Sequence, residues 1–264
     1  MNRTSITMSA VPIEFHKNTT LDSYKKFVDK FKDWIYSTEN KIAGLPSNYY
    51  ITSGVTDALN QTYGLYNKIG VFEGEYGYHE LVAKNKLVYD FDEADVIILS
   101  HPFSANGMCN KEKLEYANSF NKPIFVDCAF FGICSSDISF DFTQYKNIES
   151  VSFSLSKTFG TGWHRVGLLF TENKNYPAAL YTGWYYDFIS SAEAHYDIID
   201  NLTPNCTYKK YKDLQDEICK ELELTPSDTV IFGLDYTNKY NEFKRGDVNR
   251  VCISNLIRER HVQS

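Results

Sequence analysis

Residues 154–167 (SLSKTFGTGWHRVG) have the clearest chemical capacity in this chain. Lys157 follows two serines, Ser154 and Ser156, and Arg165 comes eight residues after the lysine. A lysine amine forms a Schiff base with an aldehyde, and hydroxyl and guanidinium groups donate to a phosphate. Pyridoxal phosphate has both an aldehyde and a phosphate, so the segment indicates a site for this cofactor. The alternative is a surface lysine and arginine in a glycine-rich loop.

The segment resembles the lysine signature of the class I/II aminotransferases, which are fold type I pyridoxal phosphate enzymes. Ser154, Lys157 and Arg165 fall on the family's phosphate-binding serine, Schiff-base lysine and phosphate-pairing arginine. Two positions depart from the family pattern: Thr161 stands where the family usually has an aliphatic residue, and Trp163 where it usually has a small one. The resemblance implies that Lys157 is catalytic and that Ser156 joins Ser154 and Arg165 at the phosphate.

A second motif lies upstream, in residues 50–60 (YITSGVTDALN), where a short β-prone stretch leads through Ser53 and Gly54 into a helix-forming run. Such a turn directs free backbone N–H groups and the positive end of the helix dipole at an anion. It resembles the family's phosphate-binding S-G-x loop, which implies that Ser53, Gly54 and Val55 bind the cofactor. The alternative is a helix capped by Thr52 or Ser53.

Two further matches concern the cofactor ring. Residues 74–79 (GEYGYH) resemble the family segment that stacks an aromatic residue on the pyridine, and Tyr76 takes that position. A parallel aromatic contact contributes roughly 0.5–1.5 kcal/mol. Asp127 ends an apolar strand within residues 122–132 (KPIFVDCAFFG), and ligands of open α/β sheets bind at that edge. Asp127 resembles the family aspartate that pairs with the pyridine nitrogen. The alternatives are that Tyr76 only packs against neighbouring residues and that Asp127 only caps the next turn.

Two positions that meet the cofactor's phenolic oxygen are altered. Phe130 stands where the family has tyrosine, and in residues 101–107 (HPFSANG) Ser104 replaces the usual asparagine. Asn106 is an alternative donor if the loop has another register. Fewer donors to this oxygen strengthen its hold on the imine proton, so we expect the Schiff base to stay protonated to higher pH. The alternative is an altered reaction or lost activity.

Near the C-terminus, residues 246–254 (GDVNRVCIS) have the pattern of a strand with Arg250 near its start. It resembles the family strand whose arginine binds the substrate α-carboxylate, which a guanidinium matches with two parallel hydrogen bonds. Arg245 and Arg258 lie nearby, so a surface arginine is the alternative. The resemblance implies an aminotransferase that converts amino acids and keto acids through a Lys157 Schiff base. A lyase or decarboxylase of the same fold, or a cofactor-binding protein without turnover, are the other interpretations.

The elements that must position these residues follow an α/β pattern, because short apolar strands alternate with amphipathic helices. Helices are expected over 22–42, 53–66 and 111–120, and strands over 68–72, 95–100, 123–127, 150–153 and 166–171. This alternation predicts a mostly parallel central sheet flanked by helices on both faces.

After residue 200 the pattern changes to a reduced α+β region. A connecting helix is expected within 182–200, an amphipathic helix over 208–223, and strands of a small antiparallel sheet over 229–235 and 248–254. We therefore expect an N-terminal arm and helix at 1–45, a cofactor-binding large domain at 46–195 and a small C-terminal domain at 196–264.

Composition narrows the class of protein further. The chain has 264 residues with 43% hydrophobic content, which suits a globular protein but is short for the family. Its net charge of −7 argues against nucleic-acid or acidic-membrane partners. The six cysteines and six histidines show no metal-binding spacing, so no metal is expected. Without a membrane span or signal peptide a cytoplasmic location is expected, and the resemblance implies a homodimer.

Overall fold

The computed structural model describes residues 21–181 and 189–263, so the start of the N-terminal arm and of the expected connecting segment lies outside it. A seven-stranded sheet dominates the molecule, with the order β2-β9-β8-β6-β5-β3-β4. The strands are β2 (Asn48–Thr52), β3 (Ile69–Val71), β4 (Leu87–Val88), β5 (Val96–Ser100), β6 (Ile124–Cys128), β8 (Ile148–Ser154) and β9 (Gly167–Thr171).

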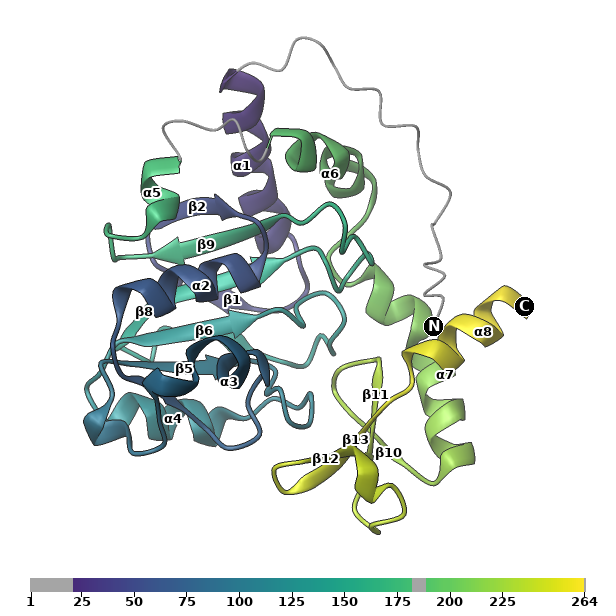
Figure 1. Ribbon diagram of the computed structural model, residues 1–264. Helices are drawn as coiled ribbons and strands as arrows, with labels where there is room; N and C mark the ends of the chain where they lie inside the picture. The colour runs from purple at the N-terminus through teal and green to yellow at the C-terminus, as the bar shows by residue number, and fades with distance from the viewer. Residues whose placement is uncertain (1–20, 182–188, 264) are drawn as a thin grey trace.

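The central sheet is mostly parallel, as predicted. Only β9 runs against its neighbours: it pairs antiparallel with β2 on one side and with β8 on the other. The remaining ladders, from β8 through β6, β5 and β3 to β4, are parallel. The C-terminal ends of the parallel strands therefore meet at one edge, which faces the second, smaller sheet (Figure 1).

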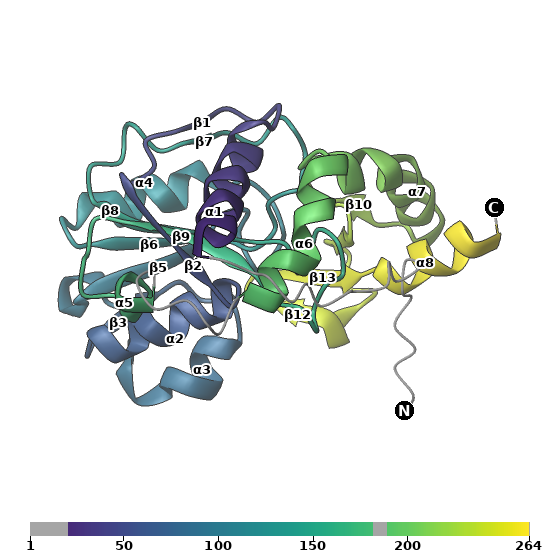
Figure 2. The same ribbon diagram turned by 90° about the horizontal axis from the view of Figure 1, so that it is seen from above.

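Helices cover both faces of this sheet, as Figure 2 shows from above. On one face lie α1 (Leu21–Tyr36) and α4 (Lys111–Ser119), and on the other α2 (Val55–Leu65), α3 (Tyr78–Ala83) and α5 (Pro177–Tyr181). The sequence of β5 explains this, because side chains alternate along a strand. Ile97 and Leu99 pack into the hydrophobic core between the sheet and helices α1 and α4, and Ile98 packs into the core on the opposite face. All three are fully buried.

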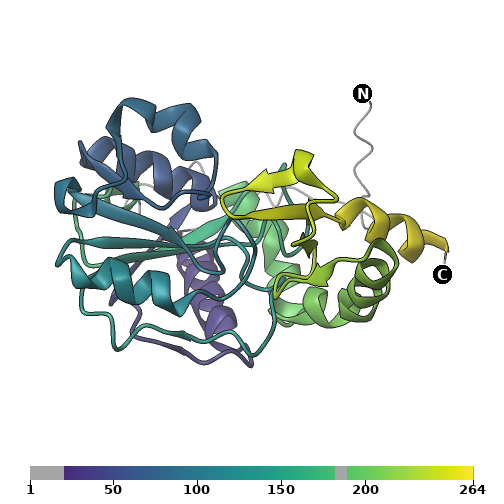
Figure 3. The same cartoon turned by 90° about the horizontal axis from the view of Figure 1, so that it is seen from below.

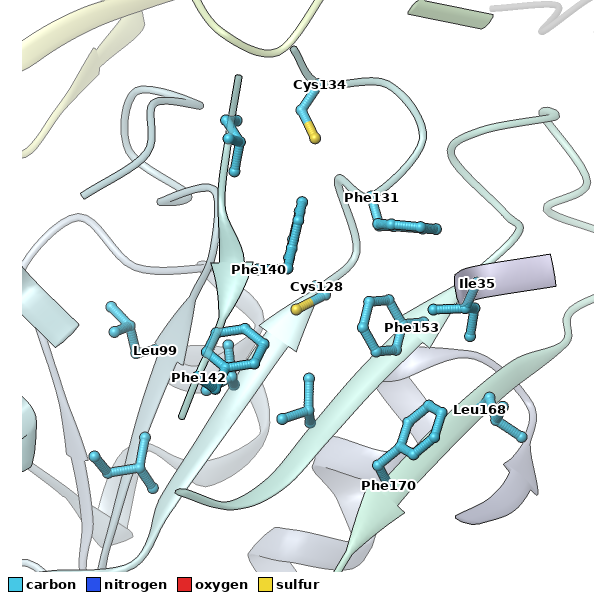
Figure 4. Close-up of a cluster of buried hydrophobic side chains, with 14 of the residues drawn as sticks. Ile35, Leu99, Cys128, Phe131, Cys134, Phe140, Phe142, Phe153, Leu168 and Phe170 are labelled. Atoms are coloured by element: carbon cyan, nitrogen blue, oxygen red, sulfur yellow. The ribbon is translucent and has the colours of Figure 1, made fainter. Parts of the chain in front are cut away.

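The core under α1 is built from aromatic rings (Figure 4). Phe131 contacts Phe140 and Phe153 edge to face, with centroids 5.5 and 5.1 Å apart, and Phe153 contacts Phe170 at 5.8 Å. Phe140 belongs to β7 (Phe140–Asp141), which pairs with β1 (Ile42–Ala43). Phe131 thus anchors the loop after β6, while its neighbour Phe130 packs with residues of the small sheet.

The second sheet is antiparallel, with the order β10 (Thr225–Pro226), β11 (Phe232–Asp235), β13 (Val248–Cys252) and β12 (Lys244–Arg245). Beside it lie α7 (Cys206–Leu222) and α8 (Ser254–Gln263), as Figures 1 and 3 show. Helix α6 (Ile189–Asn201) instead packs against α1. Three short 3-10 turns complete the elements, η1 (Lys84–Lys86), η2 (Phe91–Glu93) and η3 (Asn241–Phe243).

The connection between β10 and β11 holds the loop that follows β5. Ser227 donates through Oγ to the carbonyl of Asn106 at 2.7 Å, and Thr229 donates through Oγ1 to the carbonyl of Gly107 at 2.7 Å. The backbone N–H of Cys109 donates to Asp228 at 2.9 Å. These contacts fix the position of the small sheet relative to the edge of the large one.

The structure changes several expected boundaries. The first helix ends at Tyr36 rather than at residue 42, because the chain turns there toward the short strand β1. The elements β4, β10, β12 and α3 were not expected; each is short, with little room for a periodic pattern. The domain boundaries at 45/46 and 195/196 stay predictions. No helix in the described part of the chain is long and apolar enough to cross a membrane.

Candidate active site

The predicted site residues converge at the C-terminal edge of the parallel strands. Asp127 belongs to β6, Tyr76 follows β3, and Lys157 follows β8. These three line a small cavity together with Ser100, Ser104, Ala129 and Phe130. The parallel register creates this proximity, because Ser100 pairs with Asp127 and Asp127 pairs with Ser152 across adjacent strands. This is the edge at which open α/β sheets bind their ligands.

The start of α2 faces the same edge. Helix α2 begins at Val55 with Gly54 as its N-cap and no capping side-chain bond, so neither Thr52 nor Ser53 caps it. Gly54 has a φ of 83°, a conformation that L side chains rarely adopt. A Cβ at Gly54 would lie 3.2 Å from Nη2 of Arg165. Glycine therefore leaves space over the first helical turn, where unpaired N–H groups favour an anion.

Strand pairing brings Ser154 and Arg165 to this helix terminus. Gly167, at the start of β9, pairs with Thr52 of β2 and with Ser154 of β8. Arg165 donates from Nε to the carbonyl of Ser53 at 3.1 Å, and from Nη2 to Oγ1 of Thr56 at 2.9 Å. Hydroxyl, guanidinium and backbone N–H donors therefore surround one small space.

The hydroxyl group of Ser156 indicates what kind of group this space could bind. Its backbone N–H donates to Oγ of Ser154 at 3.2 Å, but its own Oγ is buried with no hydrogen-bond partner in the described residues. A buried hydroxyl without a partner is unfavourable unless a ligand or water supplies one. Together with the space left at Gly54, it fits a phosphate group.

Lys157 lies between two aromatic rings. Its Nζ is 4.2 Å from the ring centre of Phe130 and 5.6 Å from that of Tyr76. One side of Lys157 stays open to solvent, but the protein packed around it lowers its pKa, and the charges of Arg250, Arg165 and Arg245 add to this effect. Asp127 opposes them. A lower pKa leaves more of the amine neutral and nucleophilic at physiological pH.

Asp127 is a buried carboxylate, with 5% of its surface exposed. Its Oδ1 accepts a hydrogen bond from the N–H of Ala129 at 2.8 Å. Burial raises the pKa of Asp127, whereas the charge of Lys157 and the bond from Ala129 oppose that rise. A carboxylate of this kind suits a cationic partner in the cavity.

Glu75 is a second buried acid at the site that sequence reasoning missed. It accepts hydrogen bonds from the N–H and Oγ of Ser100, at 2.8 and 2.6 Å, and from the N–H of Tyr76 at 3.1 Å. Burial raises the pKa of Glu75 to about 7, and Asp127 adds to the rise while the hydrogen bonds oppose it. The one sequence signal was an acid directly before the aromatic Tyr76.

We expect Glu75 to make the protein less stable as pH rises. Above pH 4.5 the unfolded state loses this proton first, so the free energy of unfolding falls until Glu75 ionises in the folded state near pH 7. The total fall is about 3 kcal/mol. The variant Glu75→Gln, a neutral isostere, removes it, which denaturant unfolding between pH 4.5 and 8 would measure.

Two buried histidines also change the free energy of unfolding with pH, and comparing the parent with Glu75→Gln separates their effect from that of Glu75. Burial lowers the pKa of His79 to about 4 and lowers that of His101, so both make the folded state more stable as pH rises. The difference between parent and Glu75→Gln cancels them. Glu80→Gln is the control at an exposed position, and its free energy of unfolding should depend on pH as that of the parent does. Parallel curves for parent and Glu75→Gln would refute the assignment.

Tyr76 is held in place by its neighbours. It stacks on Tyr78, with centroids 5.7 Å apart and planes 22° apart, and meets His79 edge to face at 6.0 Å. His79 bonds through Nδ1 to the hydroxyl of Tyr63 at 2.6 Å, while its buried Nε2 has no partner in the described residues. These contacts fix the ring of Tyr76 beside the cavity.

Arg250 approaches the cavity from the small sheet. Its guanidinium lies 4.2 Å over the ring of Phe232, and its Nη1 donates to the carbonyl of Ser104. Burial lowers the pKa of Arg250 to about 10, and Arg245 adds to this effect. Its buried Nε has no partner in the part of the chain that the structure describes.

The structure also shows which residue of the loop after β5 faces the cavity, Ser104 or Asn106. Ser104 lines the cavity, whereas the side chain of Asn106 accepts a bond from the N–H of Met108 at 3.0 Å and is not among the lining residues. No cluster of metal-ligating side chains is found within residues 21–181 and 189–263.

Comparisons with known proteins support the fold. No protein-family model matches the sequence, and no curated protein matches it. Among solved structures, histidinol-phosphate aminotransferase from Clostridium acetobutylicum aligns with a TM-score of 0.61 and 18% identity, over 92% of this chain and 90% of that one. The pyridoxal phosphate-bound C-S lyase from Staphylococcus hominis aligns with 0.63 and 14%, over 83% and 69%.

A third neighbour, L-threonine-O-3-phosphate decarboxylase from Porphyromonas gingivalis, has a TM-score of 0.60 and 13% identity, over 93% of this chain and 100% of that one. The three proteins differ in reaction but share one architecture. The present chain therefore has the fold of the pyridoxal phosphate-dependent aminotransferases, as the sequence motifs predicted.

Proposed function

We propose that this protein is a pyridoxal phosphate-dependent enzyme that acts on an amino acid. The observation that carries the proposal is the position of Lys157, in one cavity with Asp127 and Tyr76 and near the donors of Ser154 and Arg165. The unpartnered hydroxyl of Ser156 supports a phosphate there. Several of the neighbouring structures were solved with pyridoxal phosphate bound.

In this proposal the backbone N–H groups at Gly54 and Val55 bind the phosphate with Ser53, Ser154, Ser156 and Arg165. Asp127 would hold the proton of the ring nitrogen, and Tyr76 and Ser104 would line the part of the cavity that takes the ring. When bound, the cofactor serves as an electron sink for the charge left on the substrate's α-carbon. Lys157, with its lowered pKa, accepts the α-proton at Nζ, and Arg250 orients the substrate α-carboxylate.

We favour transamination as the reaction. The test is to incubate cofactor-loaded protein with a panel of amino acids and to analyse the products. Stoichiometric keto acid and the amine form of the cofactor would support the aminotransferase. Release of ammonia or carbon dioxide would instead support a lyase or decarboxylase, activities named among the structural neighbours. No product from any amino acid would leave a cofactor-binding protein without turnover.

The resemblance also leads us to propose a homodimer in the cytoplasm that exchanges amino and keto acids. Light scattering coupled to gel filtration measures the mass directly. A chain of 30.4 kDa should elute at about twice that mass if the proposal holds.

Restoring the family tyrosine should change the acidity of the bound Schiff base. Phe130 offers no hydrogen bond at the cavity, so Phe130→Tyr adds a donor toward the cofactor's phenolic oxygen. We expect the imine pKa to fall by about 1, because a hydrogen bond to an ionised oxygen is worth roughly 1.5–3 kcal/mol and only part of it acts on the imine. Titration of the visible absorbance measures this, and an unchanged or raised pKa would contradict it.

A further inference from the structure

Arg245 lies on the same face of the small sheet as Arg250. It pairs with Val248 across the β12–β13 hairpin, and Val248 precedes Arg250 by two residues. Cross-strand partners and alternate residues of a strand project to the same side. Arg250 meets Phe232 on this side, and Phe232 contacts Phe130 edge to face at 5.4 Å. The face therefore continues into the wall of the cavity.

The hairpin also reaches the large sheet. A Cβ placed on Gly74 would lie 3.4 Å from the Cα of Gly246, the residue after Arg245. Gly74 begins the turn that leads to Glu75 and Tyr76. Figure 1 shows the β12–β13 hairpin extending toward that side of the molecule. The turn that follows Arg245 therefore packs beside the segment that carries Tyr76, one of the residues that line the cavity.

Three arginines lie close enough to the cavity to act on Lys157. Lys157 experiences the charges of Arg165, Arg245 and Arg250 together. None of these three arginines forms an ion pair with a carboxylate in the described residues. Arg165 belongs to the phosphate cradle and Arg250 suits an α-carboxylate, which leaves Arg245 without a counterpart. In a chain of net charge −7, such a cluster favours an anionic ligand.

We propose that Arg245 binds a second anionic group on the substrate, so that the enzyme acts on amino acids whose side chain ends in a carboxylate or a phosphate. This inference rests on the proposed function. A guanidinium matches either group with paired hydrogen bonds, and the two arginines on one sheet face are placed to bind the two ends of a short diacid.

Arg245→Gln tests the proposal through binding, without turnover. Succinate, a diacid, and propionate, its monoacid counterpart, are titrated into cofactor-loaded protein by calorimetry. We expect the variant to bind succinate about 10- to 100-fold more weakly and propionate unchanged, since one charge-assisted bond is lost. Lys244→Gln is the matched control. It removes the same charge from the adjacent, exposed residue, which pairs with Asn249 and so projects from the other face.

The outcomes separate this inference from the proposed function. If the parent binds succinate no more tightly than propionate, or if Arg245→Gln weakens both equally, Arg245 has no role at a second acid and the proposal fails. A parallel titration with 3-phosphonopropionate shows whether phosphate or carboxylate is preferred. The absorbance of the lysine-bound cofactor, recorded for every variant, shows independently whether the cofactor site itself is correct.

Discussion

Lys157→Ala should leave the protein unable to form a covalent bond with pyridoxal phosphate. The parent, mixed with the cofactor, should show a visible absorbance band, and borohydride should then fix the cofactor to the peptide containing Lys157. The variant should show neither, because Lys157 is the one lysine among the described residues that lines the cavity. Loss of the base alone should reduce turnover by roughly 10²–10⁴-fold.

An exposed lysine supplies the control for this experiment. Lys146→Ala changes a side chain that lies on the surface, so its absorbance, its mass gain after reduction and its turnover should match the parent. Mass spectrometry of the reduced protein locates the cofactor directly. A parent without the absorbance band, or a variant that gains the same mass as the parent, would overturn the cofactor proposal.

Asp127→Asn should separate cofactor attachment from catalysis. The amide oxygen of asparagine can still accept the bond from the N–H of Ala129, so the loop after β6 should stay in place. In the proposed function Asp127 keeps the ring nitrogen protonated, and the variant lacks this carboxylate. We expect turnover to fall by roughly 10²–10³-fold, the effect of removing one electrostatic stabiliser of a transition state.

The second readout for this variant is the covalent adduct itself. Borohydride should still fix the cofactor to Lys157 in Asp127→Asn, because Schiff-base formation needs the amine and not the carboxylate. Asp137→Asn, at an exposed position, should retain full turnover. An Asp127→Asn variant that keeps more than half of the parent's turnover would show that this carboxylate does not control the ring.

Much of the fold was predictable because its elements are local. Four strands of the central sheet are short apolar runs, a pattern typical of buried strands. These are β5, β6, β8 and β9, and each lies within about two residues of its expected bounds. Helix α2 follows from the turn at Gly54 and the helix-forming run behind it. The α/β alternation then determined the mostly parallel sheet.

The site was predicted through resemblance to the family's motifs, which Ser154, Lys157 and Arg165 match in type and spacing. The apolar strand that Asp127 ends places this carboxylate at one edge of a sheet. Lys157 and Asp127 line one cavity, which confirms that these two lie close together, while their roles and that of Arg165 stay proposals. Glu75 and Arg245 could not be found in this way because neither has a pattern: one is an acid in a turn, and the other ends a two-residue strand.

The sequence by itself determined which residues stand at the ends of strands and in the glycine turns, because backbone preference and apolar periodicity act over a few neighbours. Only the tertiary structure decided what meets across the cavity. The bond from Arg250 to Ser104 joins residues 146 positions apart, and the contact between Gly74 and Gly246 joins two separate sheets. Strand register and the packing of one sheet against another produce such contacts, and no local pattern encodes them.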